Sequence, residues 1–217
     1  PTTLSYSTGT ALHLETTVTD QRGHVTAYVH DDKNRVVRVH TPGTVGSRLT
    51  TAYLYDAQDN VTQVITGRED EVTTYLANPL VATATGLRTL QVTYHQYDSR
   101  GNHTQSQDLL GNTLSHTYTA SSNLLASETR TVNGVALTTR YVYDVNNHVR
   151  FTLSAEGRVS EYRYNANGTL ASTINYSGGL YTATLYTENA LSTWVSTQDK
   201  TQTQRVDTAY DFRGQVQ

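Results

Sequence analysis

The sequence predicts an all-β protein built from tandem antiparallel β-hairpins. Tyrosine recurs at a fixed place in a repeat of 21 to 25 residues. Between turn signals, short runs rich in Thr, Val and Tyr alternate between apolar and polar residues, which is typical of half-buried strands. No long segment shows an apolar period of 3.6 residues, so helix is expected to be minor.

The repeat is anchored on the residue that follows its tyrosine. Seven of the 16 tyrosines occupy this slot, and His30 and Leu76 replace tyrosine in two further units. The slot tyrosines are Tyr55, Tyr97, Tyr118, Tyr143, Tyr164, Tyr186 and Tyr210. The anchors are Asp31, Asp56, Ala77, Asp98, Thr119, Asp144, Asn165, Thr187 and Asp211. A residue that recurs in this way indicates architecture, with each unit stacking on its neighbours, rather than an active site.

Two turn signals divide each unit into two strands. Three residues after the anchor comes Asn or Gly, which tolerates the positive φ of a tight turn. These residues are Asn34, Gly101, Asn147, Gly168 and Gly214. Eight residues before the anchor lies a second glycine, at Gly23, Gly111, Gly157 or Gly179. If every unit keeps two strands, about 18 strands are expected.

Individual strands follow from the same pattern. Turns are expected at 98–101, 144–147 and 211–214. Val149, Phe151 and Leu153 alternate with polar residues in one strand. Asn133-Gly134 separates two β-rich runs at 129–132 and 135–138, which predicts a two-residue hairpin turn. This turn falls in a unit of 25 residues, so the extra length is expected to extend a hairpin.

Composition narrows the class. Only 36% of the residues are hydrophobic, but the many tyrosines argue against disorder, because disordered chains are poor in aromatic residues. A thin curved sheet with one modestly apolar face needs fewer aliphatic side chains than a globular core. The net charge of −3 gives no basic surface for nucleic acid. No apolar run is long enough to insert into a membrane, and the chain has no cysteine for disulfides or thiol chemistry.

The motif Tyr-Asp-x-x-Gly/Asn resembles the YD repeats of the Rhs family. The best copies are at 97–102, 143–148 and 210–214, and the resemblance spans the chain from Asp20 to Gly214. It implies a β-sheet ribbon that spirals into a hollow shell. In bacterial Rhs toxins and in the B and C subunits of Tc toxins, such a shell encloses a C-terminal toxin segment. Large bacterial surface proteins and the teneurins are similar.

The chain departs from the family pattern at several places. Ala77, Thr119 and Thr187 replace the aspartate, and the stretch from Ser177 to Gln204 is less regular. The Asp-Pro-x-Gly motif that supports self-cleavage in many Rhs proteins is missing. We expect residues 1–217 to form a single continuous array that is a fragment of a longer protein.

The recurring polar residues have structural roles available. The anchor carboxylate can accept backbone N–H bonds in the turn that follows it, as an Asx-turn, and Asn165 is expected to do the same. The tyrosines are expected to form ladders on neighbouring strands. A carbohydrate-binding face is the functional alternative for them.

No catalytic, cofactor-binding or metal-binding residue is predicted. The histidines are His13, His24, His30, His40, His95, His103, His116 and His148. They show no spacing typical of a metal site, and neither a nucleophile elbow nor a phosphate loop is present. The protein is therefore not expected to be an enzyme or to bind a cofactor.

Two functions remain open at this point. The first is a wall segment of a secreted bacterial shell, with neighbouring repeats and an enclosed toxin polypeptide as its partners. The second is a cell-surface adhesion module whose outer face binds glycans or a partner cell. The first is preferred, because the repeat is the only signal in the chain.

Overall fold

The structure is a computed structural model that describes residues 3–8, 14–80 and 89–217. The chain forms two compact units, Pro1–Asn112 and Thr113–Gln217. The single continuous array expected from the sequence remains a prediction.

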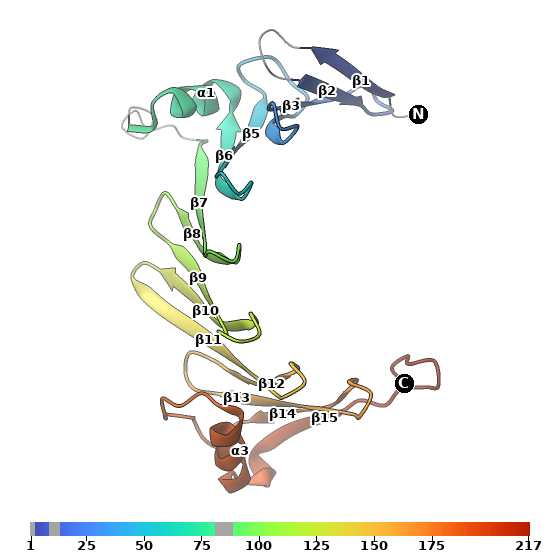
Figure 1. Cartoon of the computed structure of the whole chain (residues 1–217), viewed down its shortest axis with the longest axis vertical. Helices are drawn as coiled ribbons and strands as arrows, with labels where there is room; N and C mark the ends of the chain where they lie inside the picture. Colours follow the sequence, from blue (N-terminus) through green and yellow to red (C-terminus); the bar gives the residue numbers. More distant parts are fainter. Residues whose placement is uncertain (1–2, 9–13, 81–88) are drawn as a thin grey trace. The chain divides into compact units, whose positions relative to one another are not determined.

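The first unit contains a run of antiparallel strands and one helix (Figure 1). Each strand from β1 to β8 pairs with the next one along the chain. The strands are β1 (Thr3–Thr8), β2 (Leu14–Thr19), β3 (Val25–His30), β4 (Val36–His40), β5 (Leu49–Tyr55), β6 (Val61–Arg68), β7 (Gln91–Tyr97) and β8 (His103–Asp108). The helix α1 (Glu69–Ala77) lies between β6 and β7 in the chain.

The second unit repeats this design. Its strands run from β9 to β15, and neighbours in this series again pair antiparallel. The strands are β9 (Thr113–Tyr118), β10 (Leu125–Val132), β11 (Val135–Tyr143), β12 (Val149–Leu153), β13 (Val159–Tyr164), β14 (Leu170–Tyr176) and β15 (Thr203–Asp207). The helix α3 (Glu188–Thr197) and a single 3₁₀ turn (Lys200–Gln202) lie between β14 and β15.

The structure confirms the all-β class and the antiparallel hairpins. Neither helix exceeds ten residues, so helix is minor, as expected. The tight turns at 98–101, 144–147 and 211–214 are each closed by a backbone bond from the last residue to the carbonyl of the aspartate. The Asn133-Gly134 hairpin is also confirmed, since Val132 pairs with Val135 and both turn residues have positive φ.

The expectation of about 18 strands is wrong, because the described residues contain 15. The unit anchored at Ala77 is not a hairpin, since Ala77 is the last residue of α1. The unit anchored at Thr187 is not a hairpin either, since Thr187 is the N-cap of α3. In both places a helix of nine or ten residues lies where the repeat predicted a hairpin. The less regular stretch from Ser177 to Gln204 therefore marks a helical insertion.

A β-bulge recurs immediately before the repeat tyrosine. The register shifts by one residue between Leu54 and Tyr55, and the same shift occurs in the equivalent hairpins. The residues left unpaired on the second strand are Val37, Thr62, Thr104, Ala126, Arg150 and Ala171. A bulge increases the local twist and turns a side chain away from its regular direction. Its repetition places each tyrosine in the same way relative to its turn.

Each helix covers one small apolar core. In the first unit, Val72 and Tyr75 of α1 pack on Ala52, Ile65 and Val92 of the strands beneath. Polar residues occupy the other face of α1, so burial of this narrow stripe holds the helix on the sheet.

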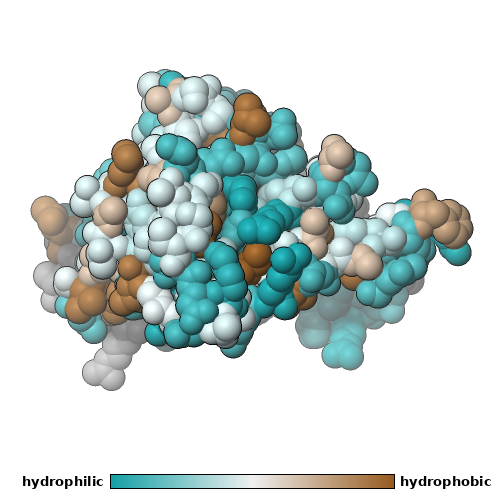
Figure 2. All heavy atoms as spheres, turned by 90° about the horizontal axis from the view of Figure 1, so that it is seen from below, coloured by the Kyte–Doolittle hydropathy of each residue, from teal (hydrophilic) through white to brown (hydrophobic). Residues whose placement is uncertain are grey.

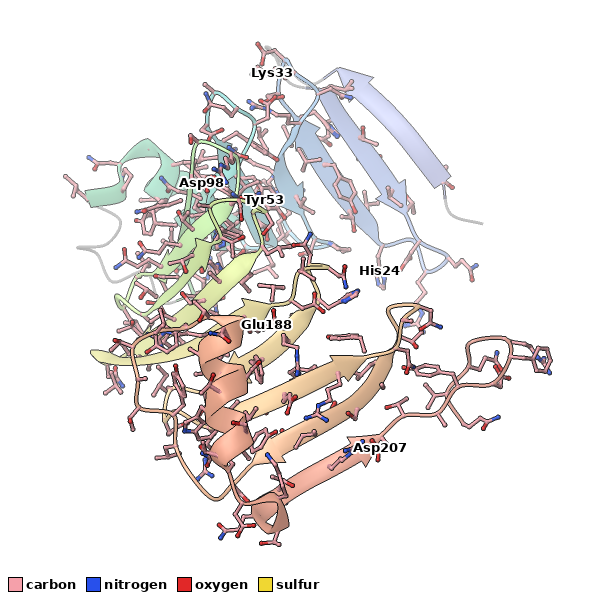
Figure 3. The ribbon with its side chains drawn as sticks, turned by 60° about the horizontal axis from the view of Figure 1, so that its bottom comes forward. His24, Lys33, Tyr53, Asp98, Glu188 and Asp207 are labelled. Atoms are coloured by element: carbon pink, nitrogen blue, oxygen red, sulfur yellow. The ribbon has the colours of Figure 1, made fainter. Side chains whose placement is uncertain are left out.

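In the second unit, Leu191 and Val195 of α3 pack over β11 to β14, where Phe151 and Leu153 are buried. Figure 3 shows α3 lying across these strands. The aromatic rings of Tyr176 and Trp194 meet edge to face at this contact, with centroids 5.8 Å apart. Both cores lie at the end of the hairpins opposite the anchor turns, because each insertion follows the second strand of its hairpin.

Candidate functional site

The anchor aspartates bind the backbone of their own turns. In each turn one carboxylate oxygen accepts the N–H of the residues two and four positions later, at 2.8–3.0 Å. The anchors that do this are Asp31, Asp56, Asp98, Asp144 and Asp211, and Asp20 and Asp108 do the same in the turns that end at Gly23 and Gly111. The Asx-turn prediction is thus confirmed for the aspartates of the repeat.

The second carboxylate oxygen is occupied as well in most of these turns. At Asp98 it accepts the side-chain amide of Asn102 at 2.8 Å, and Asp108 is bonded in the same way by Asn112. These amide bonds, with the backbone bonds, lower the pKa of both carboxyls. A carboxylate held on both oxygens is poorly placed to act as a base or metal ligand.

Residues other than aspartate also occupy the anchor position. Thr119 uses its hydroxyl oxygen, which accepts the N–H of Leu124 at 2.9 Å, in a turn one residue longer. The expectation for Asn165 is wrong in detail. Its side-chain amide donates to the hydroxyl of Thr169, while Asn167 accepts the Thr169 N–H. The acceptor for the backbone of this turn is therefore the side chain of Asn167, two residues after the anchor.

Five of the slot tyrosines connect successive hairpins through their hydroxyl groups. Each of these hydroxyls donates to the backbone carbonyl at the start of the second strand in the preceding hairpin, at 2.7–3.1 Å. The pairs are Tyr55 with Val36, Tyr97 with Val61, Tyr143 with Leu125, Tyr164 with Val149 and Tyr210 with Leu170. We call this series the tyrosine ladder. Burial raises the pKa of Tyr143 and Tyr164, which keeps these hydroxyls protonated as donors.

The ladder passes over both helical insertions. Tyr97 reaches back 36 residues to Val61, across α1, and Tyr210 reaches back 40 residues to Leu170, across α3. Tyr186, which the repeat alignment assigns to the slot, precedes α3 instead. Its ring is 39% exposed and lies under the guanidinium of Arg140, 4.4 Å from the ring centroid. The ladder therefore distinguishes true repeat tyrosines from one that only shares their spacing.

A buried carboxylate in the second unit was not predicted from the sequence. Glu161 of β13 is fully buried and accepts Arg150, Arg163 and the Tyr176 hydroxyl. Burial raises the pKa of this carboxyl, but the bonds from Arg163, Tyr176 and Arg150 outweigh it and hold the pKa below its usual range. Arg150 also lies 3.8 Å from Glu188 at the start of α3. The cluster is paired throughout and connects the helix to the sheet.

A smaller cluster in the first unit holds the start of α1. Glu69 accepts the backbone N–H of Gly46 and two bonds from Arg48. The buried His40 lies 3.7 Å from the same carboxylate and bonds the Thr50 hydroxyl at 2.8 Å. Desolvation lowers the pKa of His40, which favours the neutral ring. This arrangement anchors the helix to the loop before β5.

Two of the described histidines bond carboxylates, and two contact each other. His24 and His148 bond the carboxylates that begin their own turns, Asp20 and Asp144. His95 and His103 form a pair with ring nitrogens 3.1 Å apart. Within the described ranges, no three His, Asp or Glu side chains gather as metal ligands. His13 lies outside the described residues.

Polar grooves lie between successive anchor turns. In the first unit a groove of about 880 Å³ lies between the turns at Asp56 and Asp98. In the second unit two grooves, of about 560 and 660 Å³, lie on either side of the turn at Asp144. The face drawn in Figure 2 is mostly hydrophilic, with hydrophobic residues in separate small groups. These three grooves offer polar groups to a ligand.

No helix in the described part of the chain has the length and apolar character needed to cross a membrane. Comparison with family models and with curated proteins gives no match.

Solved structures of Tc toxins are similar to this chain. A chain of the Photorhabdus luminescens Tc holotoxin pore matches 98% of this chain with a TM-score of 0.50 and 13% identity. A crystal structure of TcdB2–TccC3 matches 98% of it with a TM-score of 0.49 and 14% identity. The chain spans 12% of the length of each of these solved chains. The likeness to the holotoxin chain shows a shared β-repeat fold.

Proposed function

We propose that this chain is a wall segment of a secreted bacterial shell of the Rhs/YD-repeat type, which encloses and delivers a toxin polypeptide. The tyrosine ladder is the observation that carries this proposal. Its bonds join a hairpin to the hairpin before it, so that a sheet can be extended one hairpin at a time. The fold shared with a Tc holotoxin chain supports the same function.

The chemistry of the turns also supports a structural role. The anchor carboxylates and the ladder hydroxyls are the polar groups that recur, and both are bonded to the backbone. Under this proposal the segment is not an enzyme and needs no cofactor. Its partners are neighbouring repeats and the enclosed polypeptide.

Imaging tests the proposal most directly. Cryo-electron microscopy of the polypeptide encoded by the natural gene should show a closed β-repeat shell with this segment in its wall. Density for a second, enclosed polypeptide segment is expected inside. An open ribbon with both faces in solvent would contradict the proposal and favour the adhesion module.

Protease digestion of the same protein provides a functional test. An enclosed polypeptide should survive digestion while the wall is intact and should be degraded when ladder bonds are removed by Tyr143→Ala together with Tyr164→Ala. Tyr186→Ala is the matched control, because this tyrosine lies outside the ladder, and protection should persist. Equal degradation in the unaltered protein would argue against enclosure.

A further inference from the structure

The groove between the turns at Thr119 and Asp144 has a lining unlike the other two. We call it the 119/144 groove. It lies within the second unit, between strands β9 to β11 and the segment that leads into α3. Its volume of about 560 Å³ is in the range of small-ligand sites. The segment before α3 adds Tyr186, which lines neither of the other two grooves, and the first residue of α3 adds Glu188, which also lines the groove on the other side of the Asp144 turn.

An aromatic ring and a cation form one side of the groove. The Tyr186 ring is 39% exposed, and the Arg140 guanidinium stacks on it at 4.4 Å from the centroid. Stacking fixes the plane of the ring, since a guanidinium is attracted to an aromatic face. The exposed remainder of the ring is an apolar surface, and the guanidinium carries N–H donors next to it.

Hydroxyl groups and a carboxylate supply further polar groups, beside the apolar Ala126, Val142 and Val145. Thr117 and Ser127 bond each other at 2.7 Å, and Thr119 and Ser122 at 2.9 Å. The side chain of Glu188 is 43% exposed and lies in the first turn of α3 (Figure 3). Hydroxyls both donate and accept hydrogen bonds, and a carboxylate accepts them from hydroxyl groups.

The charges of the groove are nearly balanced. Asp144 also lines it, but its carboxylate is bonded within its own turn to Asn146 and His148. The remaining charges are one cation, Arg140, and one anion, Glu188. A polyanion would meet two carboxylates, and an apolar ligand would take water away from Arg140 and Glu188 without replacing its hydrogen bonds.

We propose that the 119/144 groove binds a neutral saccharide. One sugar ring lies on the exposed part of Tyr186, and its hydroxyls accept from Arg140 and donate to Glu188. Aromatic stacking with hydrogen bonds around the ring edge fits a molecule that has an apolar face and a polar rim. This inference does not depend on the shell function, because the groove is complete within one unit.

Binding is tested on the 217-residue chain with defined neutral disaccharides. Cellobiose, maltose, lactose and chitobiose are titrated while ligand signals are followed by saturation-transfer NMR, with a heparin disaccharide as the anionic probe. At least one neutral sugar should saturate, and the anionic probe should bind at least tenfold more weakly. Absence of saturation by all four sugars, or equal binding of the anionic probe, would overturn the proposal.

Variants then locate the site. Tyr186→Ala and Glu188→Gln should each weaken binding of the selected sugar at least tenfold, while both variants remain folded at the temperature of the titration. Phe212→Ala is the matched control, because Phe212 is 92% exposed and also lies beside an arginine, Arg213, at 5.0 Å. It should bind as the unaltered chain does. Unchanged binding in both groove variants would exclude this site, whatever the outcome of the shell experiments.

Discussion

At the scale of single residues, two tyrosines with the same spacing in the repeat can have different roles. A hydrogen bond from the hydroxyl, which the spacing does not reveal, decides whether the tyrosine stabilises the sheet. Tyr143 and Tyr186 occupy equivalent places in the repeat alignment. The Tyr143 hydroxyl donates to Leu125 and its ring is partly buried, whereas Tyr186 is exposed beside Arg140. The two tyrosines should therefore respond differently to truncation.

Tyr143→Ala should destabilise the chain by about 3 kcal/mol, because it removes a partly buried ring and a ladder bond. Tyr143→Phe should cost about 1 kcal/mol, since only the hydroxyl is lost. Tyr186→Ala should leave stability within about 0.5 kcal/mol of the unaltered chain. Denaturant unfolding of the three variants checks these values. Equal losses at both positions would show that the ladder does not stabilise the sheet.

The anchor carboxylate can be tested in the same way. Asp144→Ala should destabilise the chain by about 1 kcal/mol, because two backbone N–H groups lose their acceptor. Asp144→Asn should cost less, since an amide oxygen can still accept. Asp32→Ala, at an exposed position inside a turn, is the control and should have little effect. Thermal or denaturant melts measure the stability of all three variants. If Asp144→Ala were as stable as the unaltered chain, the anchor would have no structural role.

At the scale of elements, the turn at Gly157 is fixed by a second segment as well as by its own backbone. Gly157 has φ +88°, and its carbonyl accepts the N–H of Tyr181 at 2.8 Å. A Cβ at this position would lie 2.6 Å from the Tyr181 carbonyl oxygen. The approach of the chain that leads into α3 therefore requires glycine here.

Gly157→Ala should destabilise the chain more than the same change at Gly111. Both glycines have positive φ, which costs about 1 kcal/mol for alanine. Only Gly157 has backbone within reach of the added methyl group, whereas open space surrounds Gly111. Unfolding midpoints of the two variants provide the comparison. Equal losses would mean that the segment around Tyr181 moves freely away from the turn.

The turns and strands could be predicted from the sequence, but the helices could not. Turns, strands and the Asn133-Gly134 hairpin were predictable because each depends on local backbone preferences. The helices were not, because α1 buries only Val72 and Tyr75, too few for a visible apolar period. The anchors at Asp56 and Asp98 are 42 residues apart, which is twice 21, so a unit at Ala77 fitted the spacing although none exists.

Prediction of the candidate site was weaker still. The 119/144 groove combines repeat residues with Tyr186 and Glu188, which approach it only because α3 folds back over the sheet. Glu161 gave no sequence signal, because its partners Arg150 and Tyr176 come from the neighbouring strands. Contacts of this kind depend on register, which a pattern of single residues does not specify.

At the scale of the whole molecule, the turns couple stability to pH. The pKa of six turn carboxyls, four at anchors and two at Asp20 and Asp108, is lowered from the usual 3.8 in the folded chain. The ionised carboxylates therefore stabilise the folded state above that value, and this contribution is lost as pH falls through the folded pKa values. We expect stability to change little between pH 7 and about pH 5 on account of these groups, and to fall steeply below about pH 4.

Unfolding in denaturant at a series of pH values measures this dependence. Asp98→Asn combined with Asp108→Asn should reduce the loss below about pH 4, because two of the responsible carboxyls are gone. Asp207→Asn removes the same kind of charge without removing a turn bond, and serves as the control. An acid transition that the double variant leaves unaltered would assign the pH dependence to other groups.

The direction of the tyrosine ladder bears on how such a chain assembles during synthesis. Every ladder tyrosine lies downstream of the carbonyl that it binds, from Tyr55 and Val36 to Tyr210 and Leu170. When a tyrosine leaves the ribosome, its acceptor has already emerged and can already be folded. Hairpins can therefore be added in the order of translation, each on a completed edge, and the nascent chain need not hold many unpaired strands at once.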